Sequence, residues 1–421
     1  MIINLKKMNK IFTLFGILAT GLFLSCKTQE PGDLVKQNFD FASEQLAYAL
    51  QAIDSAKAND ERDSLTKAEK PLVSPRTLDE NGNLKLVVSR DWTSGFFPGE
   101  LWYMYEYTKD PNWEKQARAF TASLEEQKFT RTTHDLGFMM YCSFGNGLRL
   151  TNDPSYKAIL LEAANSLISR YKSNAKIIRS WDHNRDKWQC PVIIDNMMNL
   201  ELLFWASRES GDSTYYNIAV NHANTTMKNH FRPDYGTYHV VDYDTITGEV
   251  LNRQTHQGYA HESTWARGEA WALYGYTMCH RETRDNAYLD QARHVADFIS
   301  TNPNLPEDLI PYWDFNAPAI PNEPRDASAA AIIASALYEL STYGGEKAVQ
   351  YKEQADTILK NLTLHYRTTL HDDGGFLLLH STGSKPSNSE VDVPLIYADY
   401  YFLEALNRKE KIENNLSLAK N

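Results

Sequence analysis

Two aspartates stand beside apolar runs, in settings suited to acid–base chemistry. Asp195 lies in CPVIIDNMMNLELLFW, and Asp135 lies in HDLGFMMYC. A carboxyl group in apolar surroundings loses hydration, so its pKa rises and it holds a proton near neutral pH. Either residue could instead be a helix N-cap, because an Asp side chain there accepts backbone N–H groups without doing chemistry. The residues alone leave both roles open.

Enzymes that cleave glycans commonly use two carboxyl groups, one of them protonated. Asp135 and Asp195 each precede an apolar helical run, so two helix starts could bring them to one pocket. Other acids lie in the polar connecting segments and are further candidates: Asp91, Asp182, Asp242, Glu262 and Asp326.

Arg267 is the cation whose setting most suggests ligand binding. It stands in WARGEAW, with Trp265 and Trp271 nearby. Its guanidinium could hold a ligand carboxylate through two parallel hydrogen bonds. It could equally form a structural ion pair with Glu262 or Glu269, and the sequence leaves both possibilities open.

Metal and cofactor motifs are missing from the sequence. His239, His256 and His261 form neither an HExxH pattern nor a tight ligand cluster. A phosphate loop, a dinucleotide fingerprint and a GxSxG elbow are also missing. We therefore expect no metal and no cofactor.

The elements that must position these residues are helices in an unequal repeat. Each unit has an aromatic-rich helix, a polar turn and a second helix that opens with an aromatic residue. In four units an alanine follows that aromatic residue four positions later, as Trp113/Ala117, Tyr215/Ala219, Tyr288/Ala292 and Tyr351/Ala355. A bulky residue and a small one on the same face allow close helix packing. Unequal repeats with long insertions predict an all-α, closed double ring of helices, with a small β-hairpin at Gly236–Leu251.

Seven long connectors share a composition rich in aromatic residues, His, Asp, Asn and Arg. Aromatic faces stack on sugar rings while polar groups bind hydroxyls, so these loops favour a carbohydrate site. The same aromatic residues could also pack the rim of the barrel. The 421-residue chain has a formal net charge of -11, which argues against nucleic acid as a partner.

The N-terminus has the features of an export signal. Basic residues precede the apolar run IFTLFGILATGLFLS, and Leu24-Ser25-Cys26 resembles a bacterial lipobox. We expect a signal peptide at residues 1–25, lipidation of Cys26 and a linker at 26–33. An ordinary signal with an incidental cysteine is the alternative. A single barrel domain would occupy 34–410, and a polar tail 411–421.

These features predict an exported bacterial lipoprotein, periplasmic or anchored to the outer membrane, that touches the membrane only through its lipid. Three cysteines remain beyond Cys26, and they are far apart in apolar helical contexts: Cys142, Cys190 and Cys279. Buried free thiols are expected there, because neither a disulfide framework nor a zinc spacing is present.

Several segments together resemble the unsaturated glucuronyl hydrolases of glycoside hydrolase family 88. They are HDLGF, IIDNMMNLELL, THQG followed by STWARGEAWALYGY, PRDASAAAI and LIYADYYFLEAL, within a region from about Asp91 to Leu406. The resemblance implies an (α/α)6 barrel. It also implies removal of a 4,5-unsaturated uronic acid from the non-reducing end of oligosaccharides made by polysaccharide lyases.

In the mechanism implied by this resemblance, Asp195 is the general acid and base. It protonates C4 of the vinyl ether and activates the water that adds to C5, after which the hemiketal opens and the next sugar leaves. Asp135 is the second essential aspartate. The resemblance assigns the following residues to substrate binding: Trp92, His134, Trp181, His239, Thr255, Gln257, Arg267, Trp271, Ser384 and Ser387.

Three other functions stay open at this stage. The related rhamnogalacturonyl hydrolases share the barrel and chemistry but act on pectin fragments. A non-catalytic, glycan-binding surface lipoprotein would need the aromatic residues and Arg267 but not Asp195. An α/α-barrel hydrolase of ordinary saturated glycosides is the third. The aglycone sugar, tolerance of sulfate and the oligomeric state are likewise open.

Overall fold

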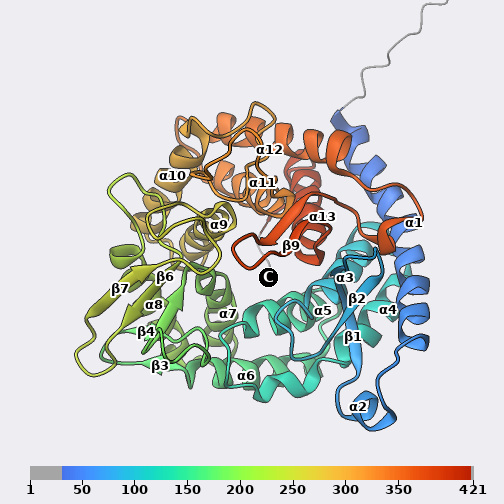
Figure 1. Cartoon of the computed structure of the whole chain (residues 1–421), viewed down its shortest axis with the longest axis horizontal. Helices are drawn as coiled ribbons and strands as arrows, with labels where there is room; N and C mark the ends of the chain where they lie inside the picture. The colour runs from blue at the N-terminus through green and yellow to red at the C-terminus, as the bar shows by residue number, and fades with distance from the viewer. Residues whose placement is uncertain (1–30, 419–421) are drawn as a thin grey trace, which may run out of the picture.

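Helices form two concentric rings in the computed structural model, which describes residues 31–418 (Figure 1). Six helical segments of this described part make the inner ring: α3 (Phe96–Thr108), η2 (Gly137–Gly145) continuing into α5 (Asn146–Thr151), η3 (Ile194–Asn199) continuing into α7 (Leu200–Ser210), α9 (Ala266–Thr283), α11 (Ala327–Ser341) and α13 (Ile396–Glu413). The outer ring has α1 (Pro31–Ala58), α4 (Pro111–Ala122), α6 (Pro154–Ile168), α8 (Ser213–Asn229), α10 (Asn286–Thr301) and α12 (Ala348–Asn361). Because α13 packs against α3, the inner ring closes, and the predicted (α/α)6 barrel is confirmed.

Burial follows the two rings. Helices α9 and α11 are buried almost all round, as expected for helices that are covered on every side. The outer helices bury a single stripe instead. The predicted aromatic–alanine pairs lie on that stripe and are all buried: Trp113/Ala117, Tyr215/Ala219, Tyr288/Ala292 and Tyr351/Ala355. The repeat therefore marks the seam between the rings.

A second feature of the repeat explains why the outer helices begin where they do. In four of them an Asp side chain accepts a backbone N–H of the first turn, and the buried aromatic residue follows three positions later. The capping residues are Asp110 before α4, Asp153 before α6, Asp212 before α8 and Asp285 before α10. An Asp cap of this kind stabilises a helix by about 1 kcal/mol.

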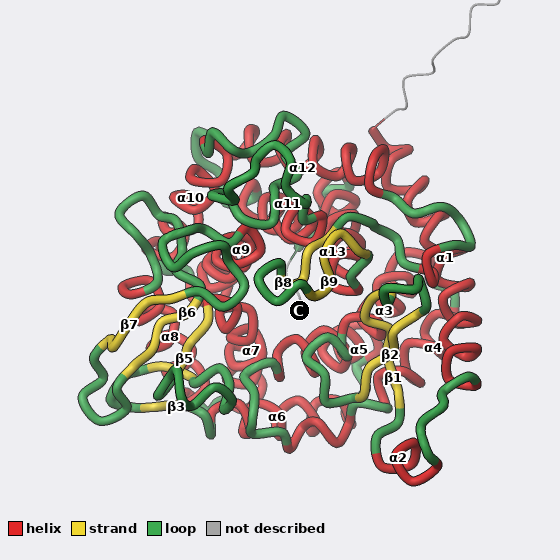
Figure 2. Tube along the Cα trace, viewed as in Figure 1, coloured by secondary structure: helices red, strands yellow, loops and turns green. Residues whose placement is uncertain are grey.

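Four small sheets lie at the loops between helices (Figure 2). Their strands are β1 (Leu72–Leu78) with β2 (Leu84–Val88), β3 (Tyr171–Lys172) with β4 (Ile177–Ile178), β5 (Pro191–Ile193) with β6 (Val240–Tyr243) and β7 (Val250–Gln254), and β8 (Ser381–Ser384) with β9 (Ser389–Val393). The β6–β7 pair is the hairpin predicted near Gly236–Leu251, and Gly248 takes a positive φ of 79° in its turn. The other strands were not predicted. The remaining short helices are α2 (Ser64–Glu69), η1 (Glu125–Phe129), η4 (Leu362–Tyr366) and η5 (Asp373–Gly375).

The last helix of the barrel extends slightly beyond its predicted limit. Helix α13 continues to Glu413, past the predicted end of the barrel at residue 410. The predicted signal peptide and Cys26 lie outside the described residues. Within residues 31–418, every helix is too short or too polar to cross a membrane. Cys142, Cys190 and Cys279 are buried thiols and form no disulfide within the described residues, as predicted.

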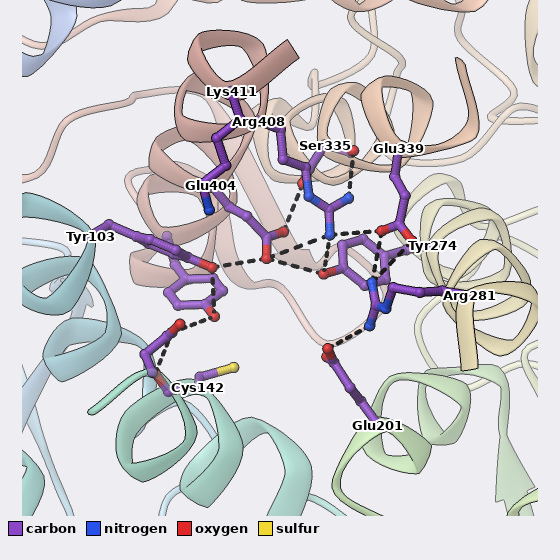
Figure 3. Close-up of polar contacts among 12 residues, drawn as sticks. Tyr103, Cys142, Glu201, Tyr274, Arg281, Ser335, Glu339, Glu404, Arg408 and Lys411 are labelled. Carbon is purple, nitrogen blue, oxygen red and sulfur yellow. Dashed lines mark hydrogen bonds and ion pairs between the residues drawn. The ribbon is translucent and has the colours of Figure 1, made fainter. Parts of the chain in front are cut away.

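A buried ionic layer joins the inner helices, near the C-terminal ends of α9 and α11 (Figure 3). Arg281 of α9 contacts Glu201 of α7 at 2.5 Å and Glu339 of α11 at 2.8 Å. Arg408 of α13 lies 2.9 Å from the same Glu339 oxygen, and 3.8 Å from Glu404. Burial alone lowers the pKa of Arg281, but the surrounding carboxylates outweigh it and raise the pKa well above its ordinary value. Ion pairs therefore link four inner helices at this end of the barrel.

We expect Arg281→Met to destabilise the barrel strongly. It leaves buried carboxylates, including Glu201, without this cation, and breaking a buried ion pair costs about 3–5 kcal/mol. The free energy of unfolding from denaturant titration measures the effect. Arg293→Met is the matched control, because Arg293 pairs with Asp290 on the surface, where their side chains are 32% and 62% exposed, and exposed pairs contribute at most about 1 kcal/mol. Equal losses in the two variants would contradict the role of the buried layer.

Candidate active site

A cavity of about 520 Å³ opens at the N-terminal ends of the inner helices. This size suits a small ligand such as a disaccharide. Its lining residues are Arg90, Asp91, Trp92, Thr132, Thr133, His134, Asp135, Trp181, His183, Ile193, Asp195, His256, Gln257, Trp265, Arg267, Ser384, Ser387 and Ser389. Both predicted catalytic aspartates and the predicted clamp Arg267 thus come to one cavity, from segments that are far apart in the chain.

Asp195 lies in the first turn of η3, directly after β5. Its side chain is not a helix cap, because the residue at the N-cap of η3 is Ile193 and no side chain caps that end. Asp195 is only 8% exposed, and its Oδ2 atom has no hydrogen-bond partner. A buried carboxylate oxygen without a partner is costly when charged, which favours the protonated form.

The pKa of Asp195 is raised to about 7, chiefly because burial removes water from the carboxyl group. Arg267 acts in the opposite direction, since its positive charge favours the ionised form. The negative charge of Asp135 raises the pKa further but is a smaller cause than burial. The acid is therefore half protonated near neutral pH.

The candidate acids other than Asp135 and Asp195 form contacts within the protein. In each case the acid has an identified partner: Arg76 for Asp91, Arg170 for Asp182, the backbone N–H groups of Gln189 and Cys190 for Asp242, the Tyr238 hydroxyl for Glu262, and Arg267 for Asp326. Among the candidate acids of the described chain, only Asp195 combines a raised pKa with an unpartnered buried oxygen.

His239 is a neutral side chain beside this acid. Its Nδ1 accepts hydrogen bonds from the backbone N–H groups of His256 and Gln257, both at 3.1 Å. An Nδ1 that accepts implies that the proton sits on Nε2, which faces Asp195 Oδ2 at 3.7 Å. Burial, with the nearby charges of His256 and Arg267, lowers the pKa of His239 well below its usual value. The imidazole is thus fixed as a neutral donor, with its Nε2 3.7 Å from the Asp195 carboxyl group.

Asp135 is more open to the cavity than Asp195, with 18% of its side chain exposed. It stands just before the π-helical segment η2, whose end has no side-chain cap. Thr133 donates its hydroxyl proton to Asp135 Oδ2, and His134 Nε2 lies 3.2 Å from Oδ1. These contacts orient both oxygens while one edge remains accessible. This arrangement suits a carboxylate that accepts hydrogen bonds from sugar hydroxyls.

Arg267 is fully buried, and its structural partner differs from those expected. The predicted alternatives Glu262 and Glu269 do not pair with it. Its Nη1 instead lies 2.8 Å from Asp326, and its two Nη atoms donate to the carbonyls of Thr382 and Gly383 at 2.5 and 2.7 Å. The correction has a simple cause: Asp326 caps α11, so its position depends on a helix far along the chain.

The Nε donor of Arg267 has no partner within the described part of the protein. This atom is buried, and the residue lines the cavity. Burial lowers its pKa, but the charges of Tyr397, Asp326 and Asp195 outweigh this and raise it. The guanidinium is therefore permanently charged, and its plane stacks over Trp265 at 4.5 Å. Ion pairing and a ligand contact are compatible here.

Aromatic residues flank the cavity on two sides. Trp181 stacks on His183 with ring centroids 5.0 Å apart and planes 16° apart, and it also contacts Trp188 and His256. Trp92, on another wall, packs on Tyr397 at 5.0 Å. The β8–β9 hairpin adds hydroxyl groups, with Ser384 donating to Ser387 at 3.1 Å. Aromatic faces and hydroxyls of this kind suit a sugar ligand.

Some predicted binding residues lie behind the wall rather than on it. Thr255 accepts the N–H of Gly258 at 2.8 Å and so shapes the loop that carries Gln257. Trp271 is fully buried below Asp195, and His239 lies beside that acid. Gln257 lines the cavity and also donates to the Gly383 carbonyl at 3.0 Å.

The cavity also contains residues that were not predicted. They are Arg90, Thr132, Thr133, His183, Ile193, His256, Trp265 and Ser389, while Asp91 was named only as a candidate acid. Most of them adjoin a predicted residue in sequence, so proximity to the motifs was the available signal. Within the described residues, no cluster of three or more His, Cys, Asp or Glu side chains is arranged to hold a metal ion.

Comparison with known proteins places the chain among enzymes of one family. A profile described as Glycosyl Hydrolase Family 88 matches residues 72–418. An unsaturated glucuronyl hydrolase of Formosa agariphila is 54% identical over 330 residues, covering 77% of this chain and 82% of the relative. An unsaturated chondroitin disaccharide hydrolase of Streptococcus pneumoniae is 33% identical over 341 residues, covering 80% and 85%.

Solved structures agree with this assignment. An unsaturated glucuronyl hydrolase specific for heparin has a TM-score of 0.84 at 45% identity, covering 91% of this chain and 98% of that chain. A variant of the Streptococcus agalactiae enzyme in complex with dGlcA-GalNAc6S has a TM-score of 0.71 at 29% identity, covering 92% and 93%. The chain therefore belongs to glycoside hydrolase family 88, as an enzyme of the unsaturated glucuronyl hydrolase type.

Proposed function

We propose that this enzyme removes the 4,5-unsaturated uronic acid from the non-reducing end of lyase-generated oligosaccharides by hydrating the C4=C5 double bond. The observation that carries the proposal is Asp195, a carboxyl group with a pKa of about 7 at an open cavity, close to a permanently charged arginine. A vinyl ether needs a proton donor at carbon, and an acid that is half protonated near neutral pH supplies one.

In the proposed reaction, the Asp195 carboxyl gives its proton to C4, and positive charge develops at C5 and the ring oxygen. A water molecule then adds to C5, and its proton returns to the Asp195 carboxylate. The hemiketal opens and releases the aglycone sugar, so one water is consumed in total. The anomeric carbon is never attacked, and the usual rule that relates carboxylate spacing to stereochemistry does not apply.

The other residues have binding roles in this proposal. Arg267 holds the uronate carboxylate, and Asp135 accepts hydrogen bonds from ring hydroxyls. His239 donates from Nε2 to the substrate or to the attacking water beside Asp195, which fits its fixed tautomer. Trp92 and Trp181 stack on sugar rings, while Ser384 and Ser387 contact the aglycone sugar and any sulfate on it.

The proposed substrates are unsaturated disaccharides from glycosaminoglycans. Relatives named for chondroitin disaccharides and for heparin support this class. Unsaturated rhamnogalacturonyl oligosaccharides from pectin are the alternative substrate. A purely glycan-binding role is disfavoured by the unpartnered, desolvated acid, because a binding protein gains nothing from it.

A panel of unsaturated disaccharides tests the substrate class. We expect loss of the ultraviolet absorbance of the conjugated alkene with chondroitin- or heparin-lyase products, and little loss with pectin-lyase products. Asp195→Asn should abolish turnover, by a factor of about 10³ or more, while retaining disaccharide binding. Turnover of saturated glycosides alone, or equal turnover by Asp195→Asn, would contradict the mechanism.

The pH dependence tests the role of Asp195 directly. Because the protonated acid is the active form, kcat/KM of the wild type should fall as pH rises through about 7. The folded pKa lies above the unfolded value, so Asp195 also costs stability progressively as pH rises from about 4 to about 7. The thermal stability of Asp195→Asn relative to wild type should therefore increase over the same range. A rate that stays flat well above pH 7 would exclude the acid role.

We also propose that the enzyme is an exported lipoprotein anchored through Cys26. The lipobox-like Leu24-Ser25-Cys26 supports this, and acyl chains anchor a protein through burial of their methylene groups. In a bacterial host, wild-type protein should incorporate labelled palmitate and sediment with membranes, whereas Cys26→Ala should be unlabelled and stay in the soluble extract. Unlabelled wild-type protein would show that the segment is an ordinary signal.

A further inference from the structure

The hairpin formed by β1 and β2 carries one arginine at an irregular position. Strand β1 pairs with β2 through Pro75–Leu86 and Thr77–Lys85, so Arg76 is an extra residue with no partner across the ladder. A β-bulge of this kind bends the strand and re-aims a side chain, often near an active site. Arg76 is 19% exposed and contacts Asp91, which lines the cavity, and Glu390, which lies on the hairpin that carries the lining residues Ser384, Ser387 and Ser389.

The guanidinium of Arg76 joins two carboxylates at once. Its Nη1 lies 3.0 and 2.9 Å from the two oxygens of Asp91. Its Nε and Nη2 contact the two oxygens of Glu390 at 2.5 and 2.9 Å. Paired, forked contacts of this type fix geometry as well as charge, and lysine cannot reproduce them. Glu390 lies 314 positions away in sequence, so Arg76 joins distant parts of the chain.

Asp91 links Arg76 to the wall of the cavity that contains Trp92. Its Oδ1 also accepts the backbone N–H of Thr93 at 2.9 Å and the Thr93 hydroxyl at 2.7 Å. These bonds fold the turn that presents Trp92 to the cavity. The position of Trp92 therefore depends on Asp91, and the orientation of Asp91 depends on Arg76.

Glu390 links Arg76 to the β8–β9 hairpin. It stands on β9, across from Gly383 of β8, and a side chain at Gly383 would clash because its Cβ would lie 2.7 Å from Glu390 Oε2. The Gly383 carbonyl in turn accepts from Arg267 at 2.7 Å. The β8–β9 hairpin, which carries Ser384, Ser387 and Ser389, is thus tied to Arg76 on one side and to Arg267 on the other. It reaches toward the centre of the ring, at the mouth of the barrel (Figure 2).

We infer that Arg76 is a positioning residue that sets the distance between Trp92 and the serine-bearing hairpin, and so determines how tightly the disaccharide is held. Arg76 is not among the residues that line the cavity. Both of its carboxylate partners are satisfied, and their pairing outweighs burial and raises its pKa. The acid chemistry on Asp195 rests on other contacts. The inference rests on the proposed function, since it assumes that a sugar spans the two walls.

Steady-state kinetics of Arg76→Met on an unsaturated chondroitin disaccharide test the inference. We expect KM to rise about tenfold with kcat within about twofold of wild type, because binding is weakened while the chemistry is retained. The pH profile of kcat should not move. Arg76→Lys should resemble Arg76→Met, since a point charge cannot bridge both acids. A fall in kcat with unchanged KM, or full rescue by lysine, would overturn the inference.

Three further measurements complete the test. Glu390→Gln removes the charge from one of the two carboxylates that pair with Arg76 and should raise KM about threefold. The double variant, Arg76→Met with Glu390→Gln, should have the same KM as Arg76→Met alone, as expected for residues that act as one unit. Additive losses would overturn the inference, even if Arg76→Met were poorly folded. Arg118→Met is the matched control, because Arg118 also bridges two acids, Glu114 and Asp153, but on the outer ring; its kinetics should equal those of wild type.

A binding arm separates this inference from the proposed function. Dissociation constants for the same disaccharide are measured by tryptophan fluorescence in the Asp195→Asn protein, with and without Arg76→Met. A tenfold weakening, about 1.4 kcal/mol, supports the positioning role even if turnover of that substrate proved absent. Equal dissociation constants would overturn it, whereas an inactive wild type would contradict only the proposed reaction.

Discussion

The chemistry proposed for this enzyme depends on keeping one carboxyl group, that of Asp195, uncharged beside a cation. Asp195 has lost its water, and its Oδ2 has no compensating donor. An arginine nearby would ordinarily hold such a group ionised. Here Arg267 already pairs with Asp326 and donates to two backbone carbonyls, and these contacts offset much of its attraction for a charged Asp195. Desolvation therefore outweighs attraction, and the pKa rises to about 7 rather than falling.

The same arrangement explains how an acidic protein can bind an anionic sugar. Asp326 offsets much of the positive charge of Arg267 in the free enzyme, so the arginine can stay buried and charged without a ligand. The unpartnered Nε of Arg267 is the donor that the proposed function assigns to the substrate. His239 is held neutral, so it adds a donor without adding charge that would depress the pKa of Asp195. The cavity thus combines a buried cation with an acid that is half protonated near neutral pH, the two groups that the proposed reaction of an unsaturated uronate requires.

Local sequence patterns were sufficient for the parts of this structure that depend on neighbours in the chain. The aromatic–alanine spacing marked the seam between the two rings, and the apolar residues around Asp195 indicated its burial. Contacts across the barrel left no such pattern. Arg267 pairs with Asp326, 59 positions away, although Glu269 was nearer in sequence. The β8–β9 hairpin was not predicted, because STGS has no large apolar residue and SEVDV has only two, too few for the alternating pattern of a strand.

That hairpin shows how the fold separates chemistry from specificity. The floor of the cavity is built at the ends of inner helices, whose opposite ends are joined by buried ion pairs. Such a floor cannot move without disturbing the barrel core. The hairpin of β8 and β9 has three residues with positive φ, Asn388, Glu390 and Asp392, and its short ladder is irregular between Ser381 and Thr382. Side-chain contacts from Arg76 and Arg267 add a constraint to that short ladder. A wall fixed by a few side chains can change its sequence and its ligand while the helical floor, and the acid on it, stay the same.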